Sequence, residues 1–159
     1  MDVVIFIGLQ ASGKSTFYRT YFAATHGYIS KDVLQHNKRP QRRQMQLLEE
    51  ALREQRSVVV DNTNATVEVR KPLIEMGRLY GAKIIGYYFE SEVRQCIERN
   101  KQREGKAKVP DVAIYVTAKK LVRPSYEEGF EQLYNVRIVG EGRFEVRDWE
   151  ETEYLMPPQ

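Results

Sequence analysis

Short runs of apolar residues alternate along the chain with longer segments in which apolar positions recur every three or four residues. The apolar runs predict buried strands at residues 3–7, 28–30, 57–61 and 82–89. The recurring spacing predicts helices between these strands, at residues 14–24, 40–55, 69–80 and 93–97. Such an alternation indicates an α/β fold, an open and mostly parallel sheet with helices on both of its faces.

The C-terminal third continues this pattern with one helix and one hairpin. Pro110 opens a helix in which apolar residues return at turn spacing, and residues 134–139 and 143–146 read as a hairpin at the sheet edge. Residues 147–159 form an acidic tail that we expect to be partly frayed. No repeat or linker interrupts the 159 residues, so we expect a single domain, 1–159.

The segment from about residue 99 to 109 differs from the helix before it. It carries five positive side chains, no apolar stripe and a glycine, Gly105, in its middle. We expect this segment, called the lid below, to be a mobile basic loop rather than part of the core.

The first strand runs directly into the pattern G-x-x-x-x-G-K-S, which is typical of a P-loop. Its glycines allow backbone N–H groups to turn toward phosphate oxygens, and the next helix points its positive end at them. Lys14 would lie between the β- and γ-phosphates of ATP, and the Ser15 hydroxyl would bind Mg²⁺. The predicted ATP-binding residues of this loop are Gly8, Leu9, Gln10, Ala11, Ser12, Gly13, Lys14, Ser15 and Thr16.

Asp61 ends the β-branched run of the third strand, which is the usual place of the acid that accompanies a P-loop. We therefore expect Asp61 to lie near the metal together with Ser15. The residue after Asp61 is Asn62, whereas many motor-type and transporter-type ATPases have at this position a glutamate that activates water. This difference argues against ATP hydrolysis as the function of the chain. No Asn-Lys-x-Asp string for guanine is present either.

A kinase also needs a base for the acceptor hydroxyl and cations for the transferred phosphoryl group. Asp32 is the candidate base, since it follows the short second strand at the edge of the sheet that holds the P-loop. Arg99 and Arg103 are four residues apart and would share one face if the helix continued. We expect both arginines to bind the ATP phosphates as part of the lid, and Lys14, Asp32 and Arg103 to be the catalytic residues.

Composition and charge limit the remaining choices. The single cysteine, the absence of a signal sequence and the shortness of the first apolar run predict a soluble, cytoplasmic protein without a membrane anchor.

The net charge is +3, but six acids and two arginines after residue 140 leave +7 on the preceding residues. A basic body beside a P-loop suggests a polyanionic second substrate. The first concentration of positive charge contains Lys38, Arg39, Arg42 and Arg43, which we expect to contact that acceptor.

Taken in order, several of these pieces resemble one family, the polynucleotide 5′-hydroxyl kinases, including the kinase module of polynucleotide kinase/phosphatases. The resemblance covers most of the chain and includes the P-loop. The other matching segments are Ser30-Lys31-Asp32, Val60-Asp61-Asn62-Thr63-Asn64, Arg99-Asn100 to Arg103 with Val109-Pro110 after it, and Tyr126-Glu127-Glu128-Gly129-Phe130.

The resemblance implies a P-loop kinase that transfers the ATP γ-phosphate, with Mg²⁺, to the 5′-hydroxyl end of DNA or RNA in end repair. It makes Asp32 the general base and Arg103 the lid arginine, and it puts Arg70 and Asn64 against the acceptor strand. Many members have Asn-Arg-Asp in place of Ser30-Lys31-Asp32, and Gln35 stands where some have an arginine. A separate 3′-phosphatase or ligase partner would complete the repair.

Two other functions fit parts of the sequence. A small-molecule or toxin-type P-loop kinase would use Asp32 in the same way but would need no basic groove. A non-catalytic, nucleotide-gated binding module would bind ATP without an oriented base.

Overall fold

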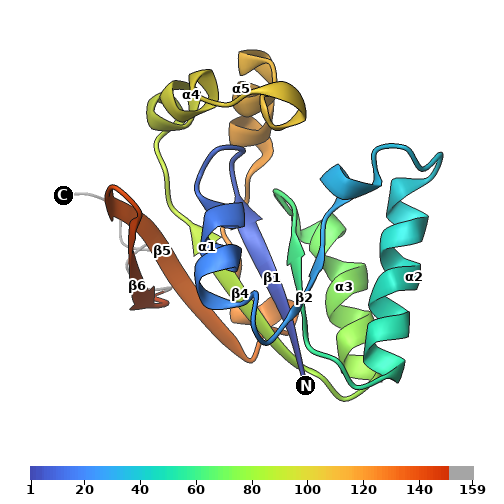
Figure 1. The fold of residues 1–159 in the computed structure, drawn as a ribbon. Coiled ribbons are helices and arrows are strands. Elements are labelled where there is room, and N and C mark those ends of the chain that lie inside the picture. Colours follow the sequence, from blue (N-terminus) through green and yellow to red (C-terminus); the bar gives the residue numbers. More distant parts are fainter. Residues whose placement is uncertain (151–159) are drawn as a thin grey trace.

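Six strands form one sheet in the order β2-β3-β1-β4-β5-β6 in the computed structural model, which describes residues 1–150 (Figure 1). The strands are β1 Asp2–Gly8, β2 Gly27–Ile29, β3 Val58–Asp61, β4 Lys83–Phe89, β5 Gln132–Gly140 and β6 Arg143–Asp148. The first five pair in parallel, and β6 pairs with β5 in the antiparallel direction. The predicted open, mostly parallel sheet with a hairpin at its edge is confirmed.

Helices lie on both faces of this sheet and beyond the carboxyl ends of its strands (Figure 1). The α-helices are α1 Lys14–Tyr21, α2 Pro40–Arg53, α3 Val67–Leu79, α4 Val93–Lys101 and α5 Asp111–Lys120. Three short 3₁₀ helices are η1 Lys31–Leu34, η2 Gly105–Ala107 and η3 Tyr126–Glu128. Figure 1 shows α2 and α3 on one face, α1 on the other, and α4 and α5 above the P-loop.

The two faces of β1 show why helices are needed on both sides. Val3, Ile5 and Ile7 pack with α2 and α3, whereas Val4 and Phe6 pack with Phe17 of α1 and its neighbours. All five β1 side chains are fully buried. A parallel strand covered on both faces therefore reads as an unbroken apolar run, as β1 does in the sequence.

The apolar stripe of α3 lies in a different phase from the one that the sequence suggests. The expected stripe begins at Val69, but that side chain is 41% exposed. The buried face instead contains Arg70, Leu73, Ile74 and Gly77. An arginine thus occupies a core position of this helix, which determines its role below.

Two helix ends differ from those expected. α1 ends at Tyr21 rather than near residue 24. α4 begins at Val93 as expected but runs past residue 97 to Lys101, where it ends, so the helix does not continue through the lid.

The first three residues of the acidic tail, 147–149, pack on the domain. β6 extends through Asp148, and the Trp149 ring lies against Tyr88 and is 9% exposed. The remainder of the tail lies outside the described residues. None of the helices within residues 1–150 is both long and apolar enough to cross a lipid bilayer.

Candidate active site

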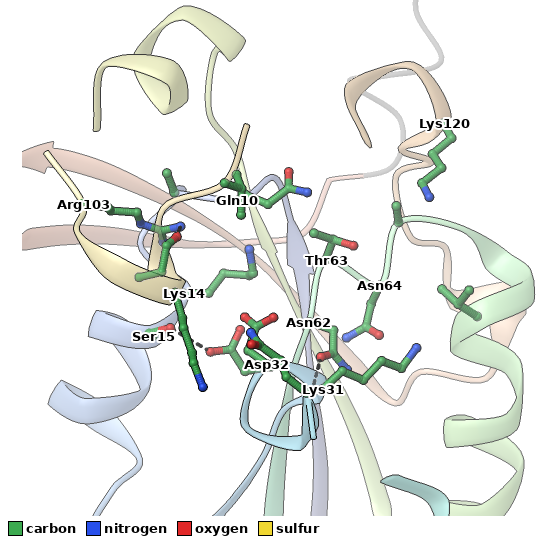
Figure 2. Close-up of a pocket in the computed structure, with 18 of the residues that line it drawn as sticks. Gln10, Lys14, Ser15, Lys31, Asp32, Asn62, Thr63, Asn64, Arg103 and Lys120 are labelled. Atoms are coloured by element: carbon green, nitrogen blue, oxygen red, sulfur yellow. Dashed lines mark hydrogen bonds between the residues drawn. The ribbon is translucent and has the colours of Figure 1, made fainter. Parts of the chain in front are cut away.

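A pocket of about 400 Å³ lies at the carboxyl ends of β1 and β3 (Figure 2). The P-loop, η1, the loop after β3, the lid and the end of α5 all contribute side chains to it. Figure 2 shows Lys14, Ser15 and Arg103 on one side, called the P-loop end, and Lys31 and Lys120 on the other, called the distal end. This is the edge of a parallel sheet where ligands commonly bind.

The P-loop turns sharply because two of its residues have left-handed backbone conformations. Ala11 has φ of 62° and Gly13 has φ of 96°, and α1 begins at the next residue, Lys14. Gly8 is needed for space, since a Cβ there would lie 2.9 Å from the Phe89 Cβ and 3.1 Å from the Ser12 Oγ. The backbone is thus arranged to direct N–H groups and a helix N-terminus at a phosphate.

Lys14 is buried at the mouth of this loop. Its Nζ donates to the carbonyl oxygens of Gly8 at 3.1 Å and Leu9 at 2.6 Å. Burial lowers the pKa of Lys14, the Asp61 carboxylate opposes that shift, and the Arg103 charge adds to it. Lys14, Asp61 and Arg103 are therefore close enough to interact, as expected for groups around one phosphate chain.

Ser15 and Asp61 lie together, as the sequence predicts for a metal site. The Ser15 Oγ donates to the Asp61 Oδ2 at 3.2 Å, and the Tyr28 hydroxyl donates to the same oxygen at 2.6 Å. Magnesium commonly takes one or two protein oxygens and completes its shell with phosphate and water. These two oxygens fit that ion, and no cluster of three or more acid, histidine or cysteine ligands occurs within residues 1–150.

Asp32 lies in the first turn of η1, directly after β2. The Ser30 Oγ accepts a hydrogen bond from the Asp32 backbone N–H at 3.2 Å and so fixes the start of the turn. The Asp32 side chain lines the pocket between its two ends, and no hydrogen bond or ion pair of its carboxylate occurs among the described residues (Figure 2). It is available to an acceptor hydroxyl.

Arg103 reaches the pocket from the lid, whose ends are held together by the buried Asn100. The Asn100 side chain donates to the Val109 carbonyl at 2.6 Å and accepts from the Val109 N–H at 3.0 Å. Arg103 itself donates to the Ala107 carbonyl within the loop. The lid is therefore a closed loop that presents Arg103 and Lys106 to the pocket.

Arg99 does not share a face with Arg103, because α4 ends between them. Its guanidinium donates to the Ala11 carbonyl of the P-loop at 3.1 Å. Arg99 lines a second hollow of about 410 Å³ beside Gly13 and Thr16, together with Ile138 and Phe144 of the β5–β6 hairpin. The two arginines thus line two different hollows beside the P-loop.

The expected contact of Arg70 with the acceptor is wrong. Arg70 is fully buried, and its Nε and Nη2 donate to the two Glu128 carboxylate oxygens at 2.8 and 3.1 Å. Its Nη1 donates to the carbonyls of Asn64 and Val122. All four hydrogen bonds of the buried Arg70 side chain go to groups of the protein itself, so Arg70 holds the loop after β3 to the segment after α5.

The other acceptor candidates divide into two groups. Asn64 lines the pocket, although its side-chain amide donates to the Phe6 carbonyl at 2.7 Å and is largely buried. The four cations between η1 and the first turn of α2 do not line the pocket: Lys38, Arg39, Arg42 and Arg43. Their contact with an acceptor stays a prediction.

Sequence reasoning assigned no role to three lysines of the pocket or to the tyrosine behind it. Lys31, Lys106 and Lys120 line the pocket and add positive charge around Asp32, and Tyr28 donates to Asp61. Lys31 and Lys106 stand out in the sequence as members of basic runs, and Lys31 also belongs to the segment Ser30-Lys31-Asp32. The strand order is the signal that would find Tyr28, since β2 pairs with β3 and so brings Tyr28 beside the strand that ends at Asp61.

Two curated relatives of the chain are described as bifunctional polynucleotide phosphatase/kinases, and another is described as the transcription factor bHLH140 of Arabidopsis thaliana. Over 140 residues the chain is 28% identical to the bifunctional polynucleotide phosphatase/kinase of Schizosaccharomyces pombe, covering 85% of this chain and 33% of that protein. It is 26% identical to a putative protein of the same description from Acanthamoeba polyphaga mimivirus, with the same coverage. The chain spans about a third of the length of these two relatives.

Solved structures with the same fold include kinases of different substrates. Kti12 from Chaetomium thermophilum, in complex with ADP-AlF3, has a TM-score of 0.68 at 15% identity, covering 86% of this chain and 89% of that one. A fungal RNA kinase has a TM-score of 0.62 at 16% identity, covering 86% of this chain and 38% of that one. A gluconokinase from Sinorhizobium meliloti has a TM-score of 0.61 at 17% identity, covering 87% of this chain and 83% of that one. At such identities the likeness shows the P-loop kinase fold alone.

A family model describes most of the chain as one unit. The AAA_33 model, described as an AAA domain, matches residues 3–123, from the first strand through the P-loop and the lid to the end of α5. The chain therefore belongs to the AAA_33 family of AAA domains, with a P-loop kinase fold and distant homology to the kinase module of polynucleotide phosphatase/kinases.

Proposed function

We propose that the chain is an ATP-dependent kinase that phosphorylates the 5′-hydroxyl end of a nucleic acid. The observation that carries this proposal is the Asp32 carboxylate, which accepts no hydrogen bond and forms no ion pair among the described residues and lines the same pocket as Lys14, Ser15 and Asp61. An oriented base beside a P-loop is what a kinase requires and a hydrolase or binding module does not. The homology to polynucleotide kinases supports the choice of acceptor.

Asp32 acts on the acceptor. Its carboxylate takes the proton of the 5′-hydroxyl as that oxygen bonds to the γ-phosphorus, and the bond from phosphorus to the β-phosphate oxygen breaks to release ADP. A hydroxyl between Asp32 and the P-loop end lies in line for this transfer. Positioning of the two reactants supplies much of the rate in such reactions.

Lys14 and Arg103 act on the phosphates. Both are cations at the P-loop end, and neither forms an ion pair with a residue in the described part of the chain. Their charges stabilise the oxygens of the phosphoryl group during transfer. Ser15 and Asp61 would hold Mg²⁺, whose chemistry there would be to neutralise negative charge on the ATP phosphates.

The hollow beside Arg99 suits the base of the nucleotide. It opens at Gly13 and Thr16, next to the P-loop, and Ile138 and Phe144 give it apolar walls. A planar base packs well between such side chains and a guanidinium. ATP would then run from this hollow, past the start of α1, to Lys14.

The test is a transfer assay with radiolabelled ATP and Mg²⁺ on four acceptors: a DNA and an RNA oligonucleotide with 5′-hydroxyl ends, a nucleoside and gluconate. We expect label on the oligonucleotide ends and little on the small molecules. Label on gluconate or another small alcohol alone would replace the proposal with a small-molecule kinase. Tight ATP binding without any transfer would indicate a nucleotide-gated binding module.

A further inference from the structure

β6 is the last strand of the sheet, and only one of its two edges is paired within residues 1–150 (Figure 1). β5 lies on its inner side, and no described strand lies on its outer side. The N–H and C=O groups along such an outer edge can pair with another extended chain. The opposite edge of the sheet is β2, which has three residues, whereas β6 has six. The sheet is therefore better suited to extension at β6.

The charges on one face of β6 alternate in sign. Arg143, Glu145 and Arg147 share this face because side chains of a strand point to its two sides in turn. The Glu145 carboxylate lies 2.9 Å from the Arg137 Nη2 and 2.6 Å from the Arg147 Nε. The side chains of Glu145 and Arg147 are nevertheless 35% and 63% exposed. Both charges can therefore interact with further charges at the edge.

The other face of β6 is apolar and incompletely covered. Phe144 packs with Phe17 of α1, and Val146 lies on the same face, opposite Val136 of β5. Val146 is 45% exposed, and Tyr21, whose ring lies beside that of Phe144, is exposed as well. Apolar side chains at an open sheet edge are a surface that a partner can cover.

We propose that β6 pairs in the antiparallel direction with β6 of a second copy of this chain, so that the two sheets join into one continuous sheet. A two-fold axis through Val146 relates the copies, and the two Val146 side chains face each other. Glu145 of each copy then faces Arg147 of the other. The same surface serves both copies, so the assembly closes as a dimer. This pairing does not depend on the kinase function proposed above.

Charge selects this register from those that a two-fold axis allows. Facing residues of an antiparallel pair lie on the same side of the sheet, so the axis passes through one residue, which faces itself. An axis at an acid of β6 would oppose two carboxylates, and an axis at an arginine would oppose two guanidinium groups. Like charges directly opposite each other destabilise a strand pair, and opposite charges stabilise it.

The two apolar positions of β6 remain as places for the axis, and strand length separates them. An axis at Phe144 brings Arg143 opposite Glu145, but only residues 143–145 of the strand pair before the turn is reached. An axis at Val146 pairs residues 144–148 and forms the Glu145–Arg147 pair twice. The longer pairing is the one proposed.

The first test measures the mass in solution by sedimentation equilibrium. We expect the wild type to change from one to two chain masses as its concentration rises toward about 1 mM, the range of weak association. Val146→Lys should stay a monomer, because it brings two ammonium groups together on the axis. Val139→Lys is the matched control and should dimerise, since Val139 is 46% exposed but belongs to the inner strand β5. A wild type that stays monomeric, or equal behaviour of the two variants, overturns the proposal.

The second test uses the charges that select the register. Glu145→Arg and Arg147→Glu each place like charges opposite each other across the axis, so each alone should be a monomer. An equimolar mixture of the two variants presents only opposite charges and should form the dimer. Each variant has the same fold alone and in the mixture, so recovered mass reports contact between the two strands. A mixture that stays monomeric although both variants are folded by circular dichroism overturns the register and the pairing with it.

Hydrogen exchange of the wild type gives a readout that needs no variant. The outward N–H groups of residues 143–148 should exchange more slowly in concentrated than in dilute solution, because the dimer encloses them in new hydrogen bonds. Equal exchange of these groups in samples whose mass has doubled would place the interface elsewhere and overturn the proposal.

Discussion

Arg70 and Glu128 form a bidentate ion pair in the interior: the Arg70 Nε and Nη2 donate to the two carboxylate oxygens of Glu128. The Arg70 side chain is 0% exposed and that of Glu128 8%. Glu128 also accepts from the Ser125 N–H at the start of η3. One buried pair thus joins α3, the loop after β3, the end of α5 and η3.

Arg70→Ala should destabilise the fold rather than weaken acceptor contacts directly. The change leaves the Glu128 carboxylate and two carbonyls buried without their donor, which typically costs about 3–5 kcal/mol for a broken buried pair. Chemical denaturation followed by circular dichroism measures the loss. Lys71→Ala is the control, because the adjacent Lys71 forms only an exposed pair with Glu75 and should change stability little. Equal stability of the two variants would show that the buried pair is not structural.

Asp32→Asn should abolish transfer while ATP binding and thermal stability remain near wild type. Asparagine keeps the size and polarity of the side chain but takes no proton from the acceptor, and the loss of a general base lowers rates by about 10²- to 10⁴-fold. Single-turnover kinetics and the binding of a fluorescent ATP analogue separate the two effects. Near-normal turnover in this variant would rule out Asp32 as the base.

Arg103→Lys should reduce kcat by at least about tenfold with a smaller effect on ATP binding. Lysine keeps the charge but loses the planar fork that binds two phosphate oxygens. Lys101→Ala is the control, since Lys101 lies on the exposed face of α4 and pairs with Glu98. Similar, small effects of both changes on kcat would mean that Arg103 does not act on the phosphates.

Tyr28→Phe should raise the Mg²⁺ concentration that gives half-maximal activity, because Asp61 loses the hydroxyl that holds its Oδ2. Tyr18→Phe is the control: the Tyr18 ring packs in a tilted arrangement against Tyr28, at 4.6 Å between centroids, but its hydroxyl donates to the His26 carbonyl. This change should leave the Mg²⁺ requirement unchanged. Electron paramagnetic resonance of bound Mn²⁺, measured with ATP, checks the metal affinity without turnover. An unchanged Mn²⁺ affinity in Tyr28→Phe would contradict the role.

The same tyrosine also gives a pH expectation. Burial and the Asp61 carboxylate raise the pKa of Tyr28 to about 12. The folded state therefore keeps this proton where the unfolded chain begins to release it, near the reference value of about 10. The contribution to stability is complete below pH of about 10 and is lost as pH rises toward 12, so the hydrogen bond to Asp61 persists throughout the neutral range.

The residues whose positions follow from local pattern could be predicted from the sequence. The P-loop, the acid at the end of β3 and the base after β2 each come directly after an apolar run, and parallel strands bring their carboxyl ends to one edge. Lys14, Ser15, Asp32 and Asp61 accordingly meet in one pocket as expected.

The residues whose positions depend on distant segments could not be predicted in this way. Arg70 looks like a surface cation until the phase of α3 is known, and its partner Glu128 lies 58 residues away. Lys120 reaches the pocket only because the segment after α5 packs on residues 64–66. Tyr28 contacts Asp61 because β2 pairs with β3, and no periodicity in the sequence predicts that pairing.

The pairing of Asn100 with Val109 has a consequence for how this scaffold can diversify. Because one amide joins the two ends of the lid, residues 102–108 leave and rejoin the domain at a single point, outside both α4 and α5. Doubling the length of such a loop costs only about 0.6 kcal/mol in closure entropy. We therefore expect a Gly-Ser insertion after Gly105 to leave the melting temperature nearly unchanged, as thermal denaturation can check, and a melting temperature lowered as far as in Asn100→Ala would contradict this. The lid can therefore vary in length and charge while the core of the domain stays the same.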